Sequence, residues 1–224
     1  TSMITRLLID GKADPTAIVG GKIHSIDSNS RIGKSQNMVC EACEYVDTFL
    51  QLYPAISVIT NIDDDHLDYF GNIENLIASF RKFASQTSKT IFVNGDDENS
   101  MKAVADLDVP VITFGFGEHN MYRAENMCEK DKVCEQFSII KNNSTLCSLN
   151  LSVPGKYNVY NALAAAAVAD FMGIDGATIK ESLHNFSGVH RRFEILGKPN
   201  NITVADDFAH HPTEIKAVLS AAMK

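Results

Sequence analysis

The sequence of 224 residues has no cluster of basic residues, no long hydrophobic run and no glycine-rich phosphate loop. Its 28 acidic residues outnumber its 20 basic residues, so the net charge is −8 and nucleic acid is not expected as a partner. The longest apolar run, residues 162–169, is far too short to cross a bilayer. We therefore expect neither nucleic-acid binding nor a place within a membrane.

Signals for export and for a disulfide framework are also missing. No secretion signal opens the sequence. The five cysteines are odd in number and irregularly spaced. Cys40 and Cys43 form a CxxC pair, but the chain has no second CxxC pair that could complete a metal site with it. Free thiols and a cytoplasmic location are expected, since reducing compartments keep cysteines unpaired.

The nucleotide-binding loop of many ATPases is absent in its usual form. The pattern Gly-x-x-x-x-Gly-Lys-Ser/Thr occurs nowhere in the chain. Gly33-Lys34-Ser35 has the ending of that pattern but lacks the upstream glycine at the required spacing, so we interpret it as a chance match.

Strand and helix signals alternate along most of the sequence. Hydrophobic residues make up 45% of the chain and charged residues 21%, as in ordinary globular proteins. Between about residues 121 and 153, short alternating runs separated by turn residues predict a small antiparallel sheet. The prediction is an α/β fold with a mostly parallel central sheet, flanking helices and a small antiparallel β-hairpin subsheet. Strands are expected at 17–21, 37–40, 55–59, 90–94, 109–114, 192–196 and 202–205, and helices at 1–9, 73–85, 158–172, 176–183 and 212–223.

An acidic loop follows the apolar run 55–59, which reads as a buried parallel strand. Ligands sit at the carboxyl ends of such strands. The loop has four carboxylates and an imidazole within six positions, a donor set that suits Mg²⁺ or Mn²⁺. The alternative is a solvated acidic turn that caps the next helix. The residues are Asp63, Asp64, Asp65, His66 and Asp68.

Glu41 also comes directly after an expected strand. If that strand and the strand before the acidic loop are parallel neighbours, the Glu41 carboxylate and the His66 ring lie at adjacent tips and complete one metal shell. The alternative is an exposed carboxylate at a strand end.

Two further polar clusters stand at expected turns. Asn158 and Asn161 are three residues apart at a helix start, so their amides share a face and offer the donor and acceptor that an adenine edge needs. Helix capping is the alternative for them. Arg191 and Arg192 suit phosphate oxygens, and the carboxylates at 206 and 207 suit ribose hydroxyls or a cation. The alternative for the arginine pair and for the two carboxylates is an ordinary group of surface charges.

Together these clusters resemble the motifs of the Mur ligase family, ATP-dependent amide-forming enzymes of bacterial peptidoglycan synthesis. Four motifs occur in the family's order over about 170 residues. They are Thr60-Asn61-Ile62-x-x-Asp65-His66-Leu67-Asp68, Pro154-Gly155-x-x-Asn158-x-x-Asn161-Ala162, Arg192-Phe193-Glu194, and the run from Asp206 to Glu214.

The resemblance implies the cofactors ATP and Mg²⁺ and a role for each matching residue. Tyr157 departs from the pattern, because the family usually has histidine there. The implied roles are Glu41 and His66 as Mg²⁺ ligands, Asn158 and Asn161 at the adenine, Arg192 at the phosphates, Asp207 at the ribose, and His210 and His211 near the amino-acid substrate, with His66 and Arg192 the catalytic pair.

Within the family, the segment Glu41-Ala42-Cys43-Glu44-Tyr45 is most similar to ligases that join L-alanine to UDP-N-acetylmuramate through an acyl phosphate. The resemblance also implies that residues 1–206 form the central ATP-binding domain and that 207–224 are the hinge and first helix of the next domain. The family's phosphate loop would precede Thr1, so this segment alone is expected not to ligate. The alternatives are a ligase that recycles muramyl peptide onto UDP-N-acetylmuramate, and a non-catalytic nucleotide-binding module.

Overall fold

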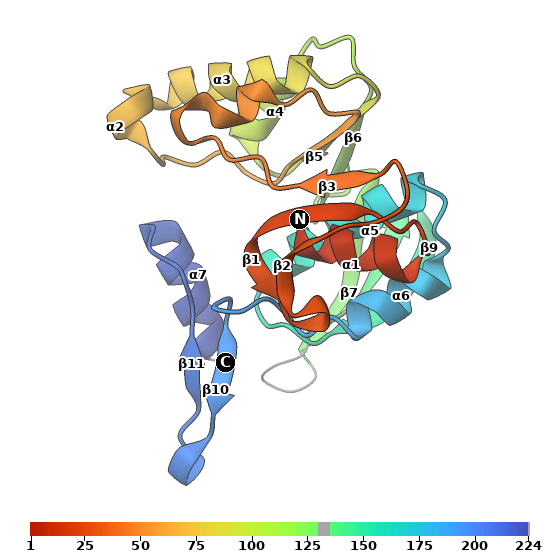
Figure 1. The fold of residues 1–224 in the computed structure, drawn as a ribbon, viewed down its shortest axis with the longest axis vertical. Helices are drawn as coiled ribbons and strands as arrows, with labels where there is room; N and C mark the ends of the chain where they lie inside the picture. Colours follow the sequence, from red (N-terminus) through yellow and green to blue (C-terminus); the bar gives the residue numbers. More distant parts are fainter. Residues whose placement is uncertain (130–134, 224) are drawn as a thin grey trace.

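The computed structural model describes residues 1–129 and 135–223. Its main sheet has six strands in the order β4-β5-β6-β7-β8-β9, with parallel pairing from β4 to β7 and antiparallel pairing from β7 to β9 (Figure 1). This confirms the predicted α/β class, and the antiparallel hairpins continue the parallel sheet. The strands are β4 Ile56–Ile59, β5 Thr90–Asn94, β6 Val111–Gly115, β7 Tyr122–Glu129, β8 Glu135–Lys141 and β9 Ser144–Leu151.

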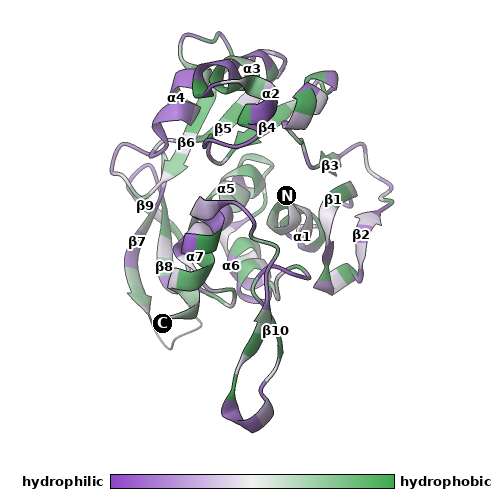
Figure 2. Ribbon diagram, turned by 90° about the vertical axis from the view of Figure 1, so that its left-hand side faces the viewer, coloured by the Kyte–Doolittle hydropathy of each residue, from purple (hydrophilic) through white to green (hydrophobic). Residues whose placement is uncertain are grey.

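Both faces of the central strand β5 are buried, as its apolar run Ile91-Phe92-Val93 predicts. Ile91 and Val93 pack with helices α3 (Ile73–Ser85) and α4 (Glu98–Val104), whereas Phe92 points to the opposite face and packs with α5 (Lys156–Phe171). In Figure 2 the strands β4 to β6 are hydrophobic, while α4 is largely hydrophilic on the outside. The sheet is therefore a layer between two sets of helices.

Helix α5 is buried on almost every side. All residues from 162 to 169 are less than 5% exposed, and alanines predominate among them. Side chains this small let α1 (Ser2–Asp10) and α6 (Gly176–His184) pack closely on the side of α5 that faces away from the sheet. The start of α5 is thereby fixed beside the carboxyl ends of β4 and β5.

A second sheet of three strands, in the order β2-β1-β3, lies beside α1. Its strands are β1 Thr16–Ile23, β2 Ser28–Arg31 and β3 Met38–Cys40, and the short helix η1 (His24–Ile26) connects β1 to β2.

The interpretation that the strand before Glu41 neighbours the strand before the acidic loop is wrong. Strand β3 pairs in parallel with β1 in the second sheet, whereas β4 pairs only with β5 among the described strands.

The C-terminal part is a β-hairpin followed by a helix. Strands β10 (Glu194–Gly197) and β11 (Val204–Asp206) pair antiparallel around η3 (Pro199–Asn201), and helix α7 is Pro212–Ala222. The hairpin projects from the rest of the molecule in both views (Figures 1 and 2).

Two short helices complete the described elements, η2 (Tyr45–Gln51) and α2 (Leu67–Phe70). Of the helices in the described ranges, none has the length and apolar character needed to span a membrane. Cys40, Cys43, Cys128 and Cys147 are free thiols, and Cys134 lies outside the described residues.

Asp96 connects the end of β5 to the loop after β6 and to α5. Its carboxylate accepts hydrogen bonds from the backbone N–H groups of Phe116 and Gly117, from the Asn120 amide and from the Tyr160 hydroxyl. Burial alone would raise the pKa of Asp96, but these hydrogen bonds outweigh it and hold the pKa below its usual value. The ionised carboxylate thus stabilises the folded state.

We expect Asp96→Asn to lower the free energy of unfolding by about 1–3 kcal/mol at neutral pH, because hydrogen bonds to a charged acceptor are lost. The folded pKa is depressed, so this contribution is complete above the unfolded pKa of about 3.9 and disappears as pH falls through the folded value. Urea unfolding of both proteins between pH 7 and pH 3 measures it. Asp108→Asn, at an exposed position, is the matched control; a pH-independent gap between Asp96→Asn and the parent would contradict the assignment.

Candidate functional site

A large cleft lies between the main sheet, the β1–β3 sheet and the C-terminal segment. Its volume of about 1830 Å³ exceeds the roughly 300–1,000 Å³ of a typical small-molecule site, so it has room for more than one ligand. Side chains from all four sequence clusters line it, namely Glu41, Asp63, Asn158, Asn161, Arg192 and Asp207. His66, His210 and His211 are outside this lining.

Glu41 follows β3 and turns back onto β1. Its Oε2 accepts the Gly20 N–H at 3.0 Å, and a Cβ at Gly20 would lie 2.7 Å from Oε1. A larger residue at position 20 would therefore push the Glu41 carboxylate out of this position. The contact holds the carboxylate in the cleft near the start of α1, where Thr1 and Ser2 also line the wall.

His66 begins helix α2 with a left-handed backbone conformation, φ 55°. Its Nε2 is 3.7 Å from Asp65 Oδ2 and 3.9 Å from Glu44 Oε1, and its ring packs on Tyr45. Glu44, Asp65 and His66 thus form a donor group able to hold a cation. Within the described chain, Glu41 makes no ion pair with His66, so the structure brings Glu44 to the imidazole instead.

The two asparagines lie at the start of α5, as predicted. Asn158 donates to the Pro154 carbonyl at 2.7 Å, and its Oδ1 accepts from the Asn161 amide at 3.3 Å. This chain of bonds fixes the orientation of Asn158 and leaves the Asn161 side chain exposed at the cleft. Gly155, at φ +98°, makes the turn into the helix.

Tyr157 joins the α5 cluster to the C-terminal cluster. Burial raises the pKa of its hydroxyl to about 12; the negative charge of Asp207 acts in the same direction, and the positive charge of Arg192 opposes it. The phenol is therefore neutral at physiological pH and can donate a hydrogen bond into the cleft.

The segment that carries the arginines is held by Asp207. One carboxylate oxygen accepts the Phe193 N–H and the other accepts the Ala209 N–H, both at 2.7 Å. Arg191 and Arg192 are exposed and lie 4.8 and 5.9 Å from the centre of the Phe208 ring. Both guanidinium groups are thus exposed at the edge of the cleft, and Arg191 lies 3.5 Å from Asp206 Oδ2.

Of the two histidines before α7, His211 contacts the acidic loop. His211 Nε2 is 2.9 Å from the Asp64 carbonyl oxygen, and Asp63 interacts with Thr213. This Thr213 hydrogen bond is the largest cause that holds the pKa of Asp63 below its usual value. His210 is more exposed and contacts the Phe208 carbonyl. Segments far apart in the sequence therefore meet at the mouth of the cleft.

Sequence reasoning missed two parts of the site. Glu44 is considered there only as part of the segment 41–45, although its carboxylate, directly before η2, is a possible metal donor. It also missed the aromatic contact of Phe116 and Tyr160, whose ring centres are 4.5 Å apart, with Lys156 Nζ 4.5 Å from the Phe116 ring centre. No sequence pattern marks this contact, because it depends on the approach of β6 to α5.

Comparison with known families assigns most of the chain. Residues 4–169 match the Mur ligase middle domain, and residues 191–224 match the Mur ligase glutamate ligase domain.

Curated relatives match over the whole chain. A UDP-N-acetylmuramate–L-alanine ligase of Caldanaerobacter subterraneus is 45% identical over 224 residues, which cover 99% of this chain and 49% of that protein. A ligase of the same name from Clostridium tetani is 44% identical with the same coverage. The chain spans about half the length of the curated relatives it matches.

Solved structures agree on the fold. UDP-N-acetylmuramate-alanine ligase MurC from Thermotoga maritima superposes with a TM-score of 0.84 at 32% identity, covering 99% of this chain and 50% of that one. A murein peptide ligase from Psychrobacter arcticus superposes at 0.77 with 25% identity, covering 99% and 51%.

Asp207→Ala should loosen the arginine-bearing segment, because two backbone N–H groups lose a charged acceptor. A loss of about 1–2 kcal/mol corresponds to an open population of the segment that is about 5- to 30-fold larger. Hydrogen–deuterium exchange at Phe193 and Ala209 measures it. The neighbouring variant Asp206→Ala removes an exposed carboxylate 3.5 Å from Arg191 and should leave both amides unchanged; equal exchange in the two variants would refute the role of Asp207.

Proposed function

Because the chain belongs to the Mur ligase family, we propose that it is part of an ATP-dependent ligase that joins L-alanine to UDP-N-acetylmuramate in the cytoplasm. The observation that supports this most strongly is the meeting of the four motif clusters around one cleft, together with 45% identity to a ligase of that name. In this proposal, residues 1–206 are the central ATP-binding domain, and 207–224 are the hinge and first helix of the next domain.

The reaction has two steps. The muramate carboxylate attacks the γ-phosphate of ATP to give an acyl phosphate and ADP, and the amine of L-alanine then displaces phosphate to form the amide. The first step must bring two anions together, so positive charge and a fixed in-line geometry are what the protein has to supply.

The donor set near the acidic loop fits Mg²⁺. Glu44, Asp65 and His66 have their ligand atoms within 4.8 Å of one another, and Glu41 adds a carboxylate on the cleft wall. Carboxylate oxygens with waters suit this ion. We propose Glu41 and His66 as its protein ligands, with Glu44 and Asp65 beside the imidazole; a bound Mg²⁺ would offset the negative charge of the phosphates.

The other side chains fit a nucleotide. We propose that Asn158 and Asn161 bind the adenine edge, because a pair of amides offers both donors and acceptors. Arg192 binds the transferring phosphate, since a guanidinium pairs with two oxygens at once. Asp207 lies between Tyr157 and the arginine segment, which supports its proposed place near the ribose.

His210 and His211 are proposed to lie near the amino-acid substrate. Their support is the contact of His211 with the acidic loop, which puts the start of α7 at the mouth of the cleft. An imidazole there can hold the alanine carboxylate or accept a proton from its amine.

We expect Glu41→Ala and His66→Ala in the full-length protein each to lower the ligation rate by about 10²-fold or more, comparable to losing one electrostatic stabiliser. Phosphate release with ATP, Mg²⁺, UDP-N-acetylmuramate and L-alanine measures the rate. Glu74→Gln, at an exposed position in the first turn of α3, is the matched control. Unchanged Mg²⁺-dependent turnover in either alanine variant would remove that residue from the metal site.

Substrate choice separates this proposal from a peptide-recycling ligase. We expect turnover of the full-length protein to depend on L-alanine and not on the tripeptide that a recycling enzyme uses. The ratio of kcat/KM for the two acceptors measures this preference. Phosphate release with each acceptor, with ATP and UDP-N-acetylmuramate fixed, is the measurement. Preference for the tripeptide would establish the recycling reaction, and no turnover with either would favour a non-catalytic module.

A further inference from the structure

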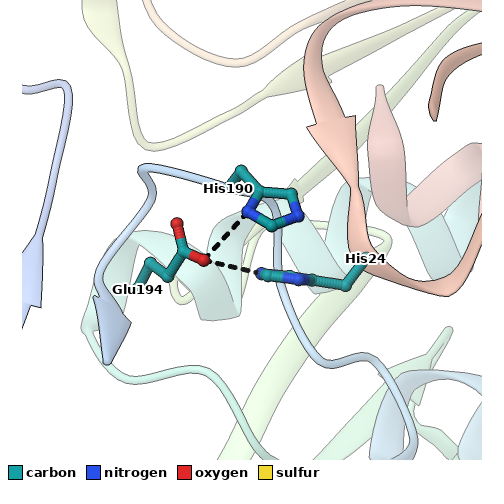
Figure 3. Close-up of side chains that lie close together, drawn as sticks. All are labelled: His24, His190 and Glu194. Atoms are coloured by element: carbon teal, nitrogen blue, oxygen red, sulfur yellow. Dashed lines mark hydrogen bonds and ion pairs between the residues drawn. The ribbon is translucent and has the colours of Figure 1, made fainter. Parts of the chain in front are cut away.

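A second cluster of metal-binding side chains lies away from the acidic loop. His24, the first residue of η1, and His190, before the arginine pair, both face the carboxylate of Glu194 at the start of β10 (Figure 3). The distance from His190 Nδ1 to Glu194 Oε1 is 2.9 Å, and that from His24 Nε2 to the same oxygen is 4.0 Å. Ligand atoms of all three residues lie within 4.8 Å of one another.

The carboxylate is held so that one oxygen faces both rings. Glu194 Oε2 accepts the backbone N–H of Arg191 at 2.9 Å, which leaves Oε1 for the two imidazoles. The rings lie close, with centres 4.0 Å apart. The hydrogen bond from the Arg191 N–H thus orients the carboxylate beside the two imidazoles. Hydrogen bonds of this kind orient the ligands in metal sites.

The chemistry of these donors favours a transition-metal ion. Two imidazole nitrogens and one carboxylate are the protein ligands of Zn²⁺ in several open sites, with bonds of about 2.0–2.2 Å and remaining positions free for water. Ligands at that radius around a tetrahedral ion are about 3.3 Å apart, a spacing between the two distances seen here. Mg²⁺ prefers oxygen donors and fits the acidic loop better.

We propose that His24, His190 and Glu194 form a binding site for Zn²⁺ or a similar first-row transition-metal ion. The site joins the end of β1 to the start of the β10–β11 hairpin.

The backbone already brings these two segments together. The His190 N–H donates to the Lys22 carbonyl at 3.0 Å, and Ile23 and Val189 form an isolated antiparallel bridge. An ion at this junction adds side-chain bonds to a contact that otherwise depends on few backbone bonds. It therefore fixes Arg191 and Arg192, which directly follow His190 in the sequence.

The test must separate this site from the donor group around His66. We therefore use the full-length protein with His66→Ala as the parent and titrate it with Co²⁺, whose visible absorption strengthens when nitrogen ligands replace water in a four- or five-coordinate site. The expected result is one intense absorbing complex, with Zn²⁺ displacing Co²⁺.

Adding His24→Ala or Glu194→Gln to the parent should raise the Co²⁺ dissociation constant by at least about 10- to 100-fold. Loss of a residue that only hydrogen-bonds to a metal ligand already weakens metal binding by this amount. His184→Ala removes an exposed histidine elsewhere and is the matched control. Weak or absent absorption in the parent, or equal affinity in the parent and His24→Ala, would overturn the proposal.

A second readout covers the case of a variant that does not fold. Zn²⁺ binds only the folded site, so it should raise the melting temperature of the parent and of His184→Ala, and slow hydrogen exchange in the hairpin. Circular dichroism checks the fold of each variant. Zn²⁺ that stabilises the parent and Glu194→Gln equally would count against the site.

Discussion

The close packing of α5 is the constraint on which the site depends. Because residues 162–169 are almost all alanine and fully enclosed, the helix lies against the sheet on one side and against α1 and α6 on the other. A larger side chain in this run would have to move a helix or distort the sheet, since cores respond to even one added methylene. The starts of α1 and α5 therefore lie along one cleft, where Ser2 and Asn158 both contribute to the wall.

The C-terminal segment depends on polar contacts rather than on a core of its own. Asp207 bonds to two backbone N–H groups, Glu194 bonds to a third, and His211 reaches the acidic loop. Hydrogen bonds of this kind are individually modest, and partly exposed ones open easily. A segment held in this way can carry arginines to a ligand and still change position, whereas a hydrophobic interface would hold it rigidly.

The sequence predicts the fold class and many of the elements because their signals are local. The helix at 73–85 and the strand at 90–94 have the predicted bounds, since apolar spacing sets each of them. Pairing is not local: nothing in the residues before Glu41 says that β3 joins β1 and not β4. The same limit applies to the site, where Asn158 and Asn161 could be placed on one helix face but the approach of Glu44 to His66 could not.

The two groups of possible metal donors differ in the type of ligand atom that they offer. Glu44, Asp65 and His66 are dominated by carboxylate oxygen, whereas His24, His190 and Glu194 are dominated by imidazole nitrogen. Hard Mg²⁺ keeps its waters and prefers oxygen, while borderline Zn²⁺ gains more from nitrogen, so the two proposed sites favour different ions. Separation by ligand type lets a protein hold a structural ion beside an arginine segment without displacing the ion that accompanies phosphates. Glu194 joins the imidazole group to the arginine pair: its Oε2 accepts the Arg191 backbone N–H, and its Oε1 faces the imidazoles.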